Sequence, residues 1–208
     1  MFEAGDGAMS KTRLPAALLV CGMIGAGAAP CAAEITPLER QRLVAHLEMT
    51  AAWFLDEVST LSPQQLAYRP TPGSWSIMEV VDHLVVVGEL YWEDLQRAVR
   101  SRALERPLTS RDEDILWYGI DRANREAAIL TENPKGQYRE LKAALDAYGG
   151  AHARLLQYAK TTSDDLRRRV VDRQGCDAYQ WALLISTHEQ RHILQIREIK
   201  RSPGFPRR

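Results

Sequence analysis

Apolar residues recur with a helical period in four separate segments of this chain. In the first segment, Leu43, Leu47, Phe54 and Val58 fall on one face when the sequence is wound at about 3.6 residues per turn. The other three segments carry stripes of the same kind. The pattern therefore predicts helices over residues 37–59, from Ser76 to before Pro107, over 137–160 and over 177–200.

Three of these helices begin with a capping box. In this motif a polar cap residue and an acid or amide three residues later each bond the other's backbone N–H. Pro37 also follows the first cap directly, at the position where a helix accepts proline. The cap pairs are Thr36 with Glu39, Ser76 with Glu79, and Asp177 with Gln180.

The connections between the helices carry their own signals. Residues 61–74 are rich in Pro and Gly and predict a loop, and 107–135 predict a long crossover with room for a short helix, for which 121–130 are suited. Gly149-Gly150 predicts a kink in the third helix, and Val170-Val171 predicts a short extended piece. The fold class that follows is all-α: a four-helix bundle with a long crossover between helices 2 and 3.

The first 33 residues differ from the rest. Lys11 and Arg13 form a short basic region, and residues 14–33 carry no charge and end in small side chains. This layout predicts a secretory signal peptide cleaved after Ala33, with Met1 or Met9 as the start, and a secreted or periplasmic domain over 34–208. The alternative is a membrane anchor, since a span needs about 20 apolar residues, but prolines and glycines interrupt this run.

Charge and cysteine content narrow the partners. The chain has 27 basic and 27 acidic residues and no basic stretch, which disfavours binding to nucleic acid or to a membrane surface. Cleavage would remove Cys21 and Cys31 and leave Cys176 alone, so the mature chain could form no internal disulfide.

Three histidines fall on the apolar faces of two predicted helices. His188 and His192 are four residues apart, which stacks their imidazoles one turn apart on one face. His83 lies between Val80 and Val87 on the apolar stripe of the second helix. A polar ring in a core must be hydrogen-bonded or ligated. We expect His83, His188 and His192 to bind one metal ion; the alternative is three hydrogen-bonded core histidines.

Residues 188–192 also match H-E-x-x-H, in which the Glu of a zinc protease acts as general base. Such a protease needs a third ligand well downstream, whereas Glu198 lies nearly on the opposite helix face. A zinc protease therefore stays a minor alternative. His46 and His152 are further candidates, either as extra ligands or as residues that bond the ligands.

Two motifs stand out, one at the start of the second predicted helix and one in the last. The first comprises Arg69, Pro70, Pro72, Gly73, Trp75, Ser76, Ile77, Glu79, Val80, His83 and Leu84. The second is His188-x-x-x-His192-x-x-Gln195. Together they resemble the signatures of the DinB-like superfamily, although the second departs from the commoner His-Arg-Gly-Gln ending. The resemblance implies a four-helix bundle, a divalent metal, zinc or nickel, held by His83, His188 and His192, and frequent dimers.

The expected function is metal-dependent catalysis on a small molecule, because three protein ligands leave one position open. The resemblance implies a thiol-dependent transferase or isomerase. The predicted export favours a hydrolase or a binding role over a thiol transferase, because the thiol cofactors of such transferases are cytosolic. The rival is a non-catalytic metal-binding or structural bundle. Trp75, Tyr91 and Trp181 are candidates for the pocket mouth or for the core, and Glu79 is expected to serve mainly as a cap.

Overall fold

The computed structural model describes residues 35–105, 108, 111–123, 129–172 and 175–207. The predicted signal peptide lies outside the described residues. The fold is all-α, with one two-stranded hairpin. The elements are α1 (Pro37–Val58), α2 (Pro63–Ala67), α3 (Ile77–Arg100), α4 (Asp112–Ile120), η1 (Leu130–Glu132), α5 (Leu141–Thr161), β1 (Val170–Val171), β2 (Cys176–Asp177) and α6 (Ala178–Arg201).

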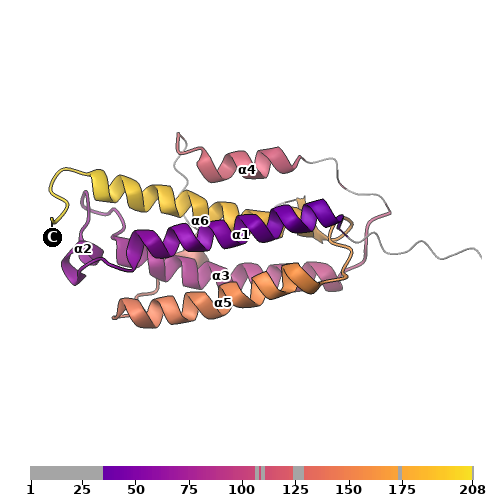
Figure 1. Cartoon of the computed structure of the whole chain (residues 1–208), viewed down its shortest axis with the longest axis horizontal. Coiled ribbons are helices and arrows are strands. Elements are labelled where there is room, and N and C mark those ends of the chain that lie inside the picture. The colour runs from indigo at the N-terminus through magenta and orange to yellow at the C-terminus, as the bar shows by residue number, and fades with distance from the viewer. Residues whose placement is uncertain (1–34, 106–107, 109–110, 124–128, 173–174, 208) are drawn as a thin grey trace, which may run out of the picture. The chain divides into compact units, whose positions relative to one another are not determined.

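Four long helices form the bundle (Figure 1). Helix α1 packs on α5 and α6, and α3 packs on the same two helices, so that α1 and α3 occupy opposite corners. The predicted apolar stripes face the interior: Leu43, Leu47, Phe54 and Val58 of α1 are fully buried. The four-helix bundle predicted from the sequence is thus confirmed.

All three predicted capping boxes are present, at Thr36, Ser76 and Asp177. The structure adds a fourth box that the prediction missed. Ser62 caps α2 and bonds reciprocally with Gln65, so a short helix lies within the predicted loop 61–74.

The crossover contains α4 and η1, and α4 lies alongside α6 (Figure 1). Gly119 allows this close approach, because a Cβ there would lie 2.9 Å from the Thr187 Cβ and 2.8 Å from the Gln190 Oε1. The predicted helical stretch 121–130 is wrong in its described part: the helix ends at Ile120, and 124–128 lie outside the described residues.

A single guanidinium joins the start of α4 to the bundle. Arg167 forms ion pairs with Glu39 of α1, Asp112 of α4 and Asp177 before α6, and it lies over the Tyr179 ring. Because its head group is mostly buried, these pairs are better shielded from water than ordinary surface ion pairs.

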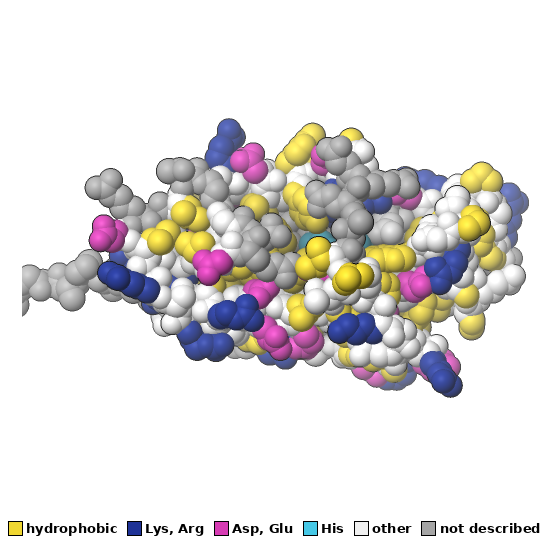
Figure 2. All heavy atoms as spheres, turned by 180° about the vertical axis from the view of Figure 1, so that it is seen from behind, with side chains coloured by type: hydrophobic (Ala, Val, Ile, Leu, Met, Phe, Trp, Pro, Cys, Tyr) yellow, Lys and Arg dark blue, Asp and Glu magenta, His cyan; other side chains and the backbone are white. Residues whose placement is uncertain are grey.

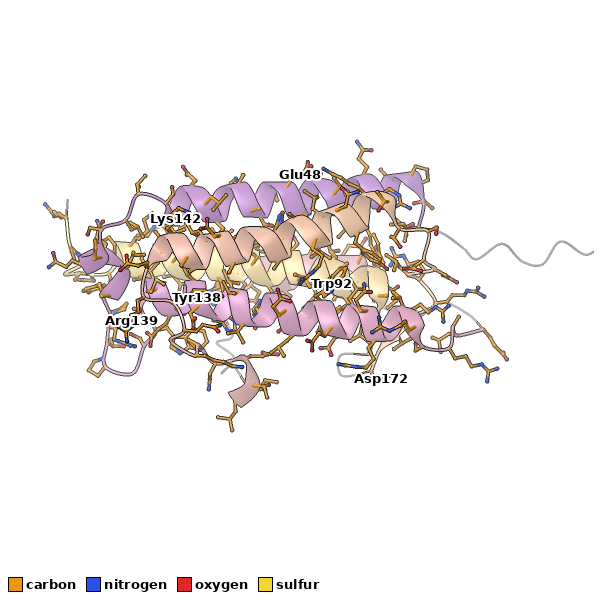
Figure 3. All side chains as sticks on the ribbon, turned by 90° about the horizontal axis from the view of Figure 1, so that it is seen from below. Glu48, Trp92, Tyr138, Arg139, Lys142 and Asp172 are labelled. Carbon is orange, nitrogen blue, oxygen red and sulfur yellow. The ribbon has the colours of Figure 1, made fainter. Side chains whose placement is uncertain are left out.

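Helix α5 begins at Leu141, four residues later than predicted, and continues as helix through Gly149 and Gly150, where the kink was expected. The side chain of Trp92 on α3, labelled in Figure 3, packs edge-on against Tyr158 of α5. The two ring centroids are 5.4 Å apart. Glu48 of α1, also labelled in Figure 3, forms an ion pair with Lys160 at the same end of α5. These contacts fix α5 against both of its neighbours.

The predicted extended piece Val170-Val171 is strand β1, which pairs antiparallel with β2 just before α6. Among the described helices, none combines the length and the hydropathy that crossing a membrane requires.

Candidate metal centre

His83 lies inside the bundle on α3, two turns after the cap of that helix, and only 1% of its surface is exposed. Its Nδ1 lies 2.5 Å from the carbonyl oxygen of Glu132 in η1. A carbonyl oxygen can only accept, so Nδ1 carries the hydrogen. The neutral ring therefore presents the lone pair of Nε2 on its other side.

The turn that supplies this carbonyl is itself held by α3. The Oδ2 atom of Asp82 accepts hydrogen bonds from the backbone N–H of Lys135, at 2.5 Å, and of Gly136, at 2.8 Å. Gly136 has a φ of 63°, which glycine adopts without strain. Two consecutive residues of α3, Asp82 and His83, thus fix both the turn and the imidazole.

His192 is oriented from within its own helix. Its Nδ1 lies 2.8 Å from the Oε1 of Gln195, one turn further along α6. With Gln195 placed so that its carbonyl oxygen faces the ring, Nδ1 donates, and the lone pair of His192 is also on Nε2. Gln195 belongs to the second sequence motif, and the structure gives this residue a physical role.

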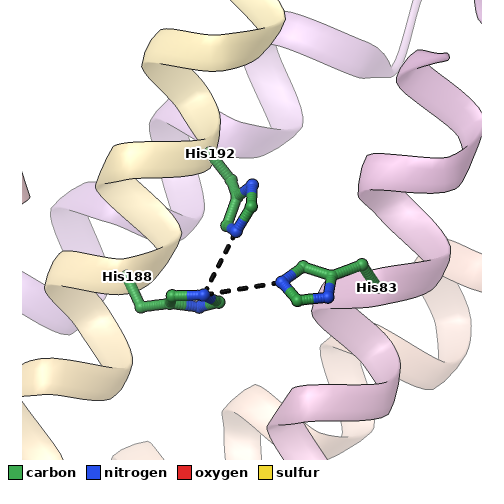
Figure 4. A group of neighbouring side chains, drawn as sticks. All are labelled: His83, His188 and His192. Atoms are coloured by element: carbon green, nitrogen blue, oxygen red, sulfur yellow. Dashed lines mark hydrogen bonds between the residues drawn. The ribbon is translucent and has the colours of Figure 1, made fainter. Parts of the chain in front are cut away.

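The three imidazoles converge on one point (Figure 4). The Nε2 of His188 lies 3.1 Å from the Nε2 of His192 and 3.4 Å from that of His83, and the three ligand atoms all lie within 4.8 Å of one another. Tetrahedral bonds of about 2.0–2.1 Å to a metal place nitrogen ligands about 3.3–3.4 Å apart. His188 Nε2 can carry one hydrogen at most, so it cannot satisfy both neighbouring lone pairs.

Burial favours the neutral form of two of these rings, His83 and His192. Loss of hydration lowers the pKa of His83, although its bond to Glu132 acts in the opposite sense. Burial, followed by the proximity of His188 and His83, lowers the pKa of His192 well below its usual value. Neutral imidazole is the form that binds a metal. His83 and His192 are therefore in the form that can hold a metal ion at neutral pH without first losing a proton.

The predicted aromatic neighbours separate into two groups. The Trp75 ring packs against His83, with centroids 4.9 Å apart, and stacks on His192 at 6.3 Å. Tyr91 lies 5.5 Å from His188 and accepts the Trp181 indole N–H with its backbone carbonyl. Trp181 is fully buried core. Trp75 and Tyr91 thus border the centre. Trp181 lies behind Tyr91 in the core and contacts its ring and its backbone carbonyl.

His46 and His152 bond elsewhere. The Nδ1 of His46 lies 2.6 Å from the Ser186 Oγ, and the Nε2 of His152 donates to the carbonyl of Leu47 at 3.1 Å. Within the described part of the chain, the group able to hold a metal contains His83, His188 and His192 and no fourth side chain.

Glu189 has a role that the sequence did not predict. Its carboxyl group is buried and bonded on both oxygens, to the Tyr148 hydroxyl and, at 3.2 Å, to the Thr50 hydroxyl. Burial raises the pKa of Glu189 to about 7. The bonds continue from Thr50 through Ser186 to His46. The H-E-x-x-H pattern drew attention to Glu189. Its partners on α1 and α5 could not be predicted from the sequence, because they depend on how these helices are oriented against α6.

Two other acids have structural partners. Glu79 caps α3 and pairs with Arg69, as expected of a cap residue, and Glu198 pairs with Arg122.

Seen from the face opposite to that of Figure 1, a small area of histidine surface is visible between hydrophobic side chains (Figure 2).

Residues 46–196 match the model of the DinB superfamily. The uncharacterized protein YuaE of Bacillus subtilis (strain 168) is 27% identical over 151 residues, which cover 70% of this chain and 89% of YuaE. A solved structure, YfiT from Bacillus subtilis, superposes with a TM-score of 0.57 at 16% identity and covers 84% of this chain and 93% of that chain. YfiT is described as a probable metal-dependent hydrolase with an unusual four-helix bundle topology. This likeness shows a shared fold.

Proposed function

The chain belongs to the DinB superfamily, and on that premise we propose that it is a metal-dependent hydrolase in which His83, His188 and His192 bind one divalent ion. The observation that carries the proposal is the convergence of the three Nε2 atoms. Two of these atoms are left without hydrogens by the bonds that His83 and His192 make to Glu132 and Gln195. A group of aligned lone pairs in a buried pocket is stable when a cation lies between them.

The number of ligands favours catalysis over a structural role. Structural zinc usually has four protein ligands, whereas catalytic zinc has three and an open position. Here His46 and His152 are engaged with Ser186 and Leu47, which supports an open fourth position. When bound, a divalent ion supplies Lewis acidity, which activates water or a thiol near neutral pH.

The residues around the centre perform the remaining tasks. Glu132 and Gln195 hold two imidazoles in the tautomer that ligation requires. Trp75 packs against His83 and His192 and limits their rotation. Burial excludes bulk water, which strengthens the electrostatic effect of any bound cation on a substrate carbonyl.

Hydrolysis is favoured over two alternatives. A fold shared with YfiT, a probable metal-dependent hydrolase, supports hydrolysis, and the predicted export of the chain disfavours a thiol-dependent transferase. A zinc protease is disfavoured because both oxygens of Glu189 are bonded to Tyr148 and Thr50, so the carboxylate is not free to act as a base. The proposal further includes zinc or nickel as the metal and a small molecule as the substrate. It also includes a secreted or periplasmic location and a homodimer.

The test is an activity screen of the zinc- or nickel-loaded protein against esters, lactones and amides, with thiol transfer measured in parallel. We expect hydrolysis of at least one substrate class and its loss in His83→Ala. The control is His46→Gln, which changes a histidine outside the centre and should retain the activity. Thiol transfer without hydrolysis would replace the proposal with the second candidate, a thiol-dependent transferase. If the protein binds the metal but catalyses neither reaction, the proposal is replaced by a non-catalytic metal-binding or structural role.

A further inference from the structure

A cavity of about 40 Å³ lies inside the bundle, and all four long helices contribute to its wall. Its apolar lining includes Leu47 of α1, Val87 of α3, Leu155 of α5 and Ile185 of α6. A water needs about 10–15 Å³ on this scale, so the space suits about three water-sized groups. The cavity is therefore too large to be an ordinary packing gap.

One wall of this cavity is part of the candidate metal centre. His188 lines the cavity, and the Tyr91 ring, which also lines it, lies 5.5 Å from the His188 ring. A ligand in the cavity would thus lie beside an imidazole whose Nε2 faces the other two histidines.

The polar groups on the wall already have partners. The Tyr148 hydroxyl donates to Glu189, whose second oxygen accepts from Thr50. The Nε2 of His152 donates to the Leu47 carbonyl. With these bonds made, the cavity offers mainly hydrocarbon surface, which favours an apolar occupant over water.

One glycine in the cavity wall is not needed for α3 and α5 to pack together. Gly88 lines the cavity in the middle of α3, where alanine is the better helix former. A Cβ at position 88 would meet only the Ala151 Cβ, at the ordinary contact distance of 3.8 Å. Alanine would fit there and would fill part of the cavity, so glycine is not imposed by the approach of the two helices.

We propose that this cavity binds a short hydrocarbon group of the substrate, of about three carbons, while the reacting group of the same molecule lies at His83, His188 and His192. The inference rests on the proposed function and adds the substrate class: small molecules that carry a short, uncharged alkyl or alkenyl group beside the bond that reacts. Gly88 then sets the length that the cavity accepts.

The test uses straight-chain hydroxamates, from acetohydroxamate to octanohydroxamate, titrated calorimetrically into the zinc-loaded full-length protein. A hydroxamate binds zinc directly, so only the chain length varies along the series. We expect the affinity to rise about fourfold per added methylene, the value for full burial of a CH₂ group, and to level off once the cavity is filled.

Gly88→Ala and Gly149→Ala form a matched pair. Both replace a glycine within a helix, but a Cβ at position 149 meets nothing within 4 Å. We expect Gly88→Ala to level off at a shorter chain, with acetohydroxamate affinity within about twofold of the wild type, and Gly149→Ala to follow the wild-type series. The same chain-length profile in Gly88→Ala and wild type would overturn the inference, as would a flat profile in the wild type. If the wild type binds no divalent metal, the proposed function fails as well.

Discussion

The Nδ1 of His192 lies 2.8 Å from the Oε1 of Gln195, so one turn of α6 contains both a candidate ligand and the group that fixes its tautomer. Loss of this acceptor leaves the ring free to turn or to carry its hydrogen on Nε2. We expect Gln195→Leu to weaken zinc binding about 10- to 100-fold, measured by competition with a chromophoric chelator. Gln195→Glu keeps an acceptor at the same position and should retain most of the affinity. Equal affinity in Gln195→Leu and the wild type would exclude this role.

Metal content tests the centre directly. The purified mature protein should contain about one divalent ion per chain, the number expected for one site with three ligands. His83→Ala and His192→Ala should each lose the ion, because removal of either residue leaves two ligands on the remaining side chains. His46→Gln should keep it. Elemental analysis after dialysis gives the stoichiometry, and unchanged content in both alanine variants would rule out these ligands.

Burial lowers the pKa of His46 below its usual value, against the raising effect of the neighbouring Gln190 side chain. The unfolded chain therefore binds more protons than the folded chain below a pH of about 6.5. The contribution of neutral His46 to the unfolding free energy is present above that pH and is lost as the pH falls. We expect the excess stability of the wild type over His46→Gln to be smaller at pH 5.5 than at pH 7.5. Urea denaturation at both pH values measures it, and an excess that grew on acidification would contradict the sign.

Gly119 lies where α4 approaches α6 closely. A methyl group at this position would lie 2.9 Å from the Thr187 Cβ and 3.1 Å from the Thr187 carbonyl oxygen, which the backbone of α6 holds in place. Gly119→Ala should lower the unfolding free energy by about 1–3 kcal/mol, the usual cost of an overpacked contact. Gly149→Ala adds the same methyl group to open space and should not destabilise the protein.

Cleavage of the signal peptide predicted over residues 1–33 can be tested on the protein recovered from outside the cytoplasm. N-terminal sequencing should begin at Glu34. A recovered chain that still carries Lys11 and Arg13 would favour the membrane anchor instead.

The sequence predicted most where the cause is local. Caps at Thr36, Ser76 and Asp177 marked helix starts correctly, because each motif needs only four consecutive residues. Helix α5 was placed four residues early, since Glu140 makes no side-chain cap and nothing in the sequence marks the start. Ser62 and Gln65 formed a valid box whose signal was outweighed by the prolines and glycine that follow.

In the candidate site, too, features with a local cause were predicted and features that depend on distant parts of the chain were not. Apolar phasing predicted that His83, His188 and His192 face the interior, where the structure brings them together, because spacing on a helix determines which face a residue occupies. The partner of His83 is a backbone carbonyl 49 residues away, and a carbonyl has no sequence signature. The partners of Glu189 lie on α1 and α5, so they depend on how three helices are rotated against one another.

His83 and His188 are 105 residues apart in the chain, and their Nε2 atoms are 3.4 Å apart in the fold. An ion bound to both would act as a removable cross-link, closing a loop that contains the whole crossover and α5. By mass action, the resistance of the bundle to unfolding would then follow the free concentration of that ion, gaining about 2.7 kcal/mol at a hundredfold excess over Kd. A chelator would loosen the α3–α6 contact in the same way that a reductant loosens a domain held by a disulfide.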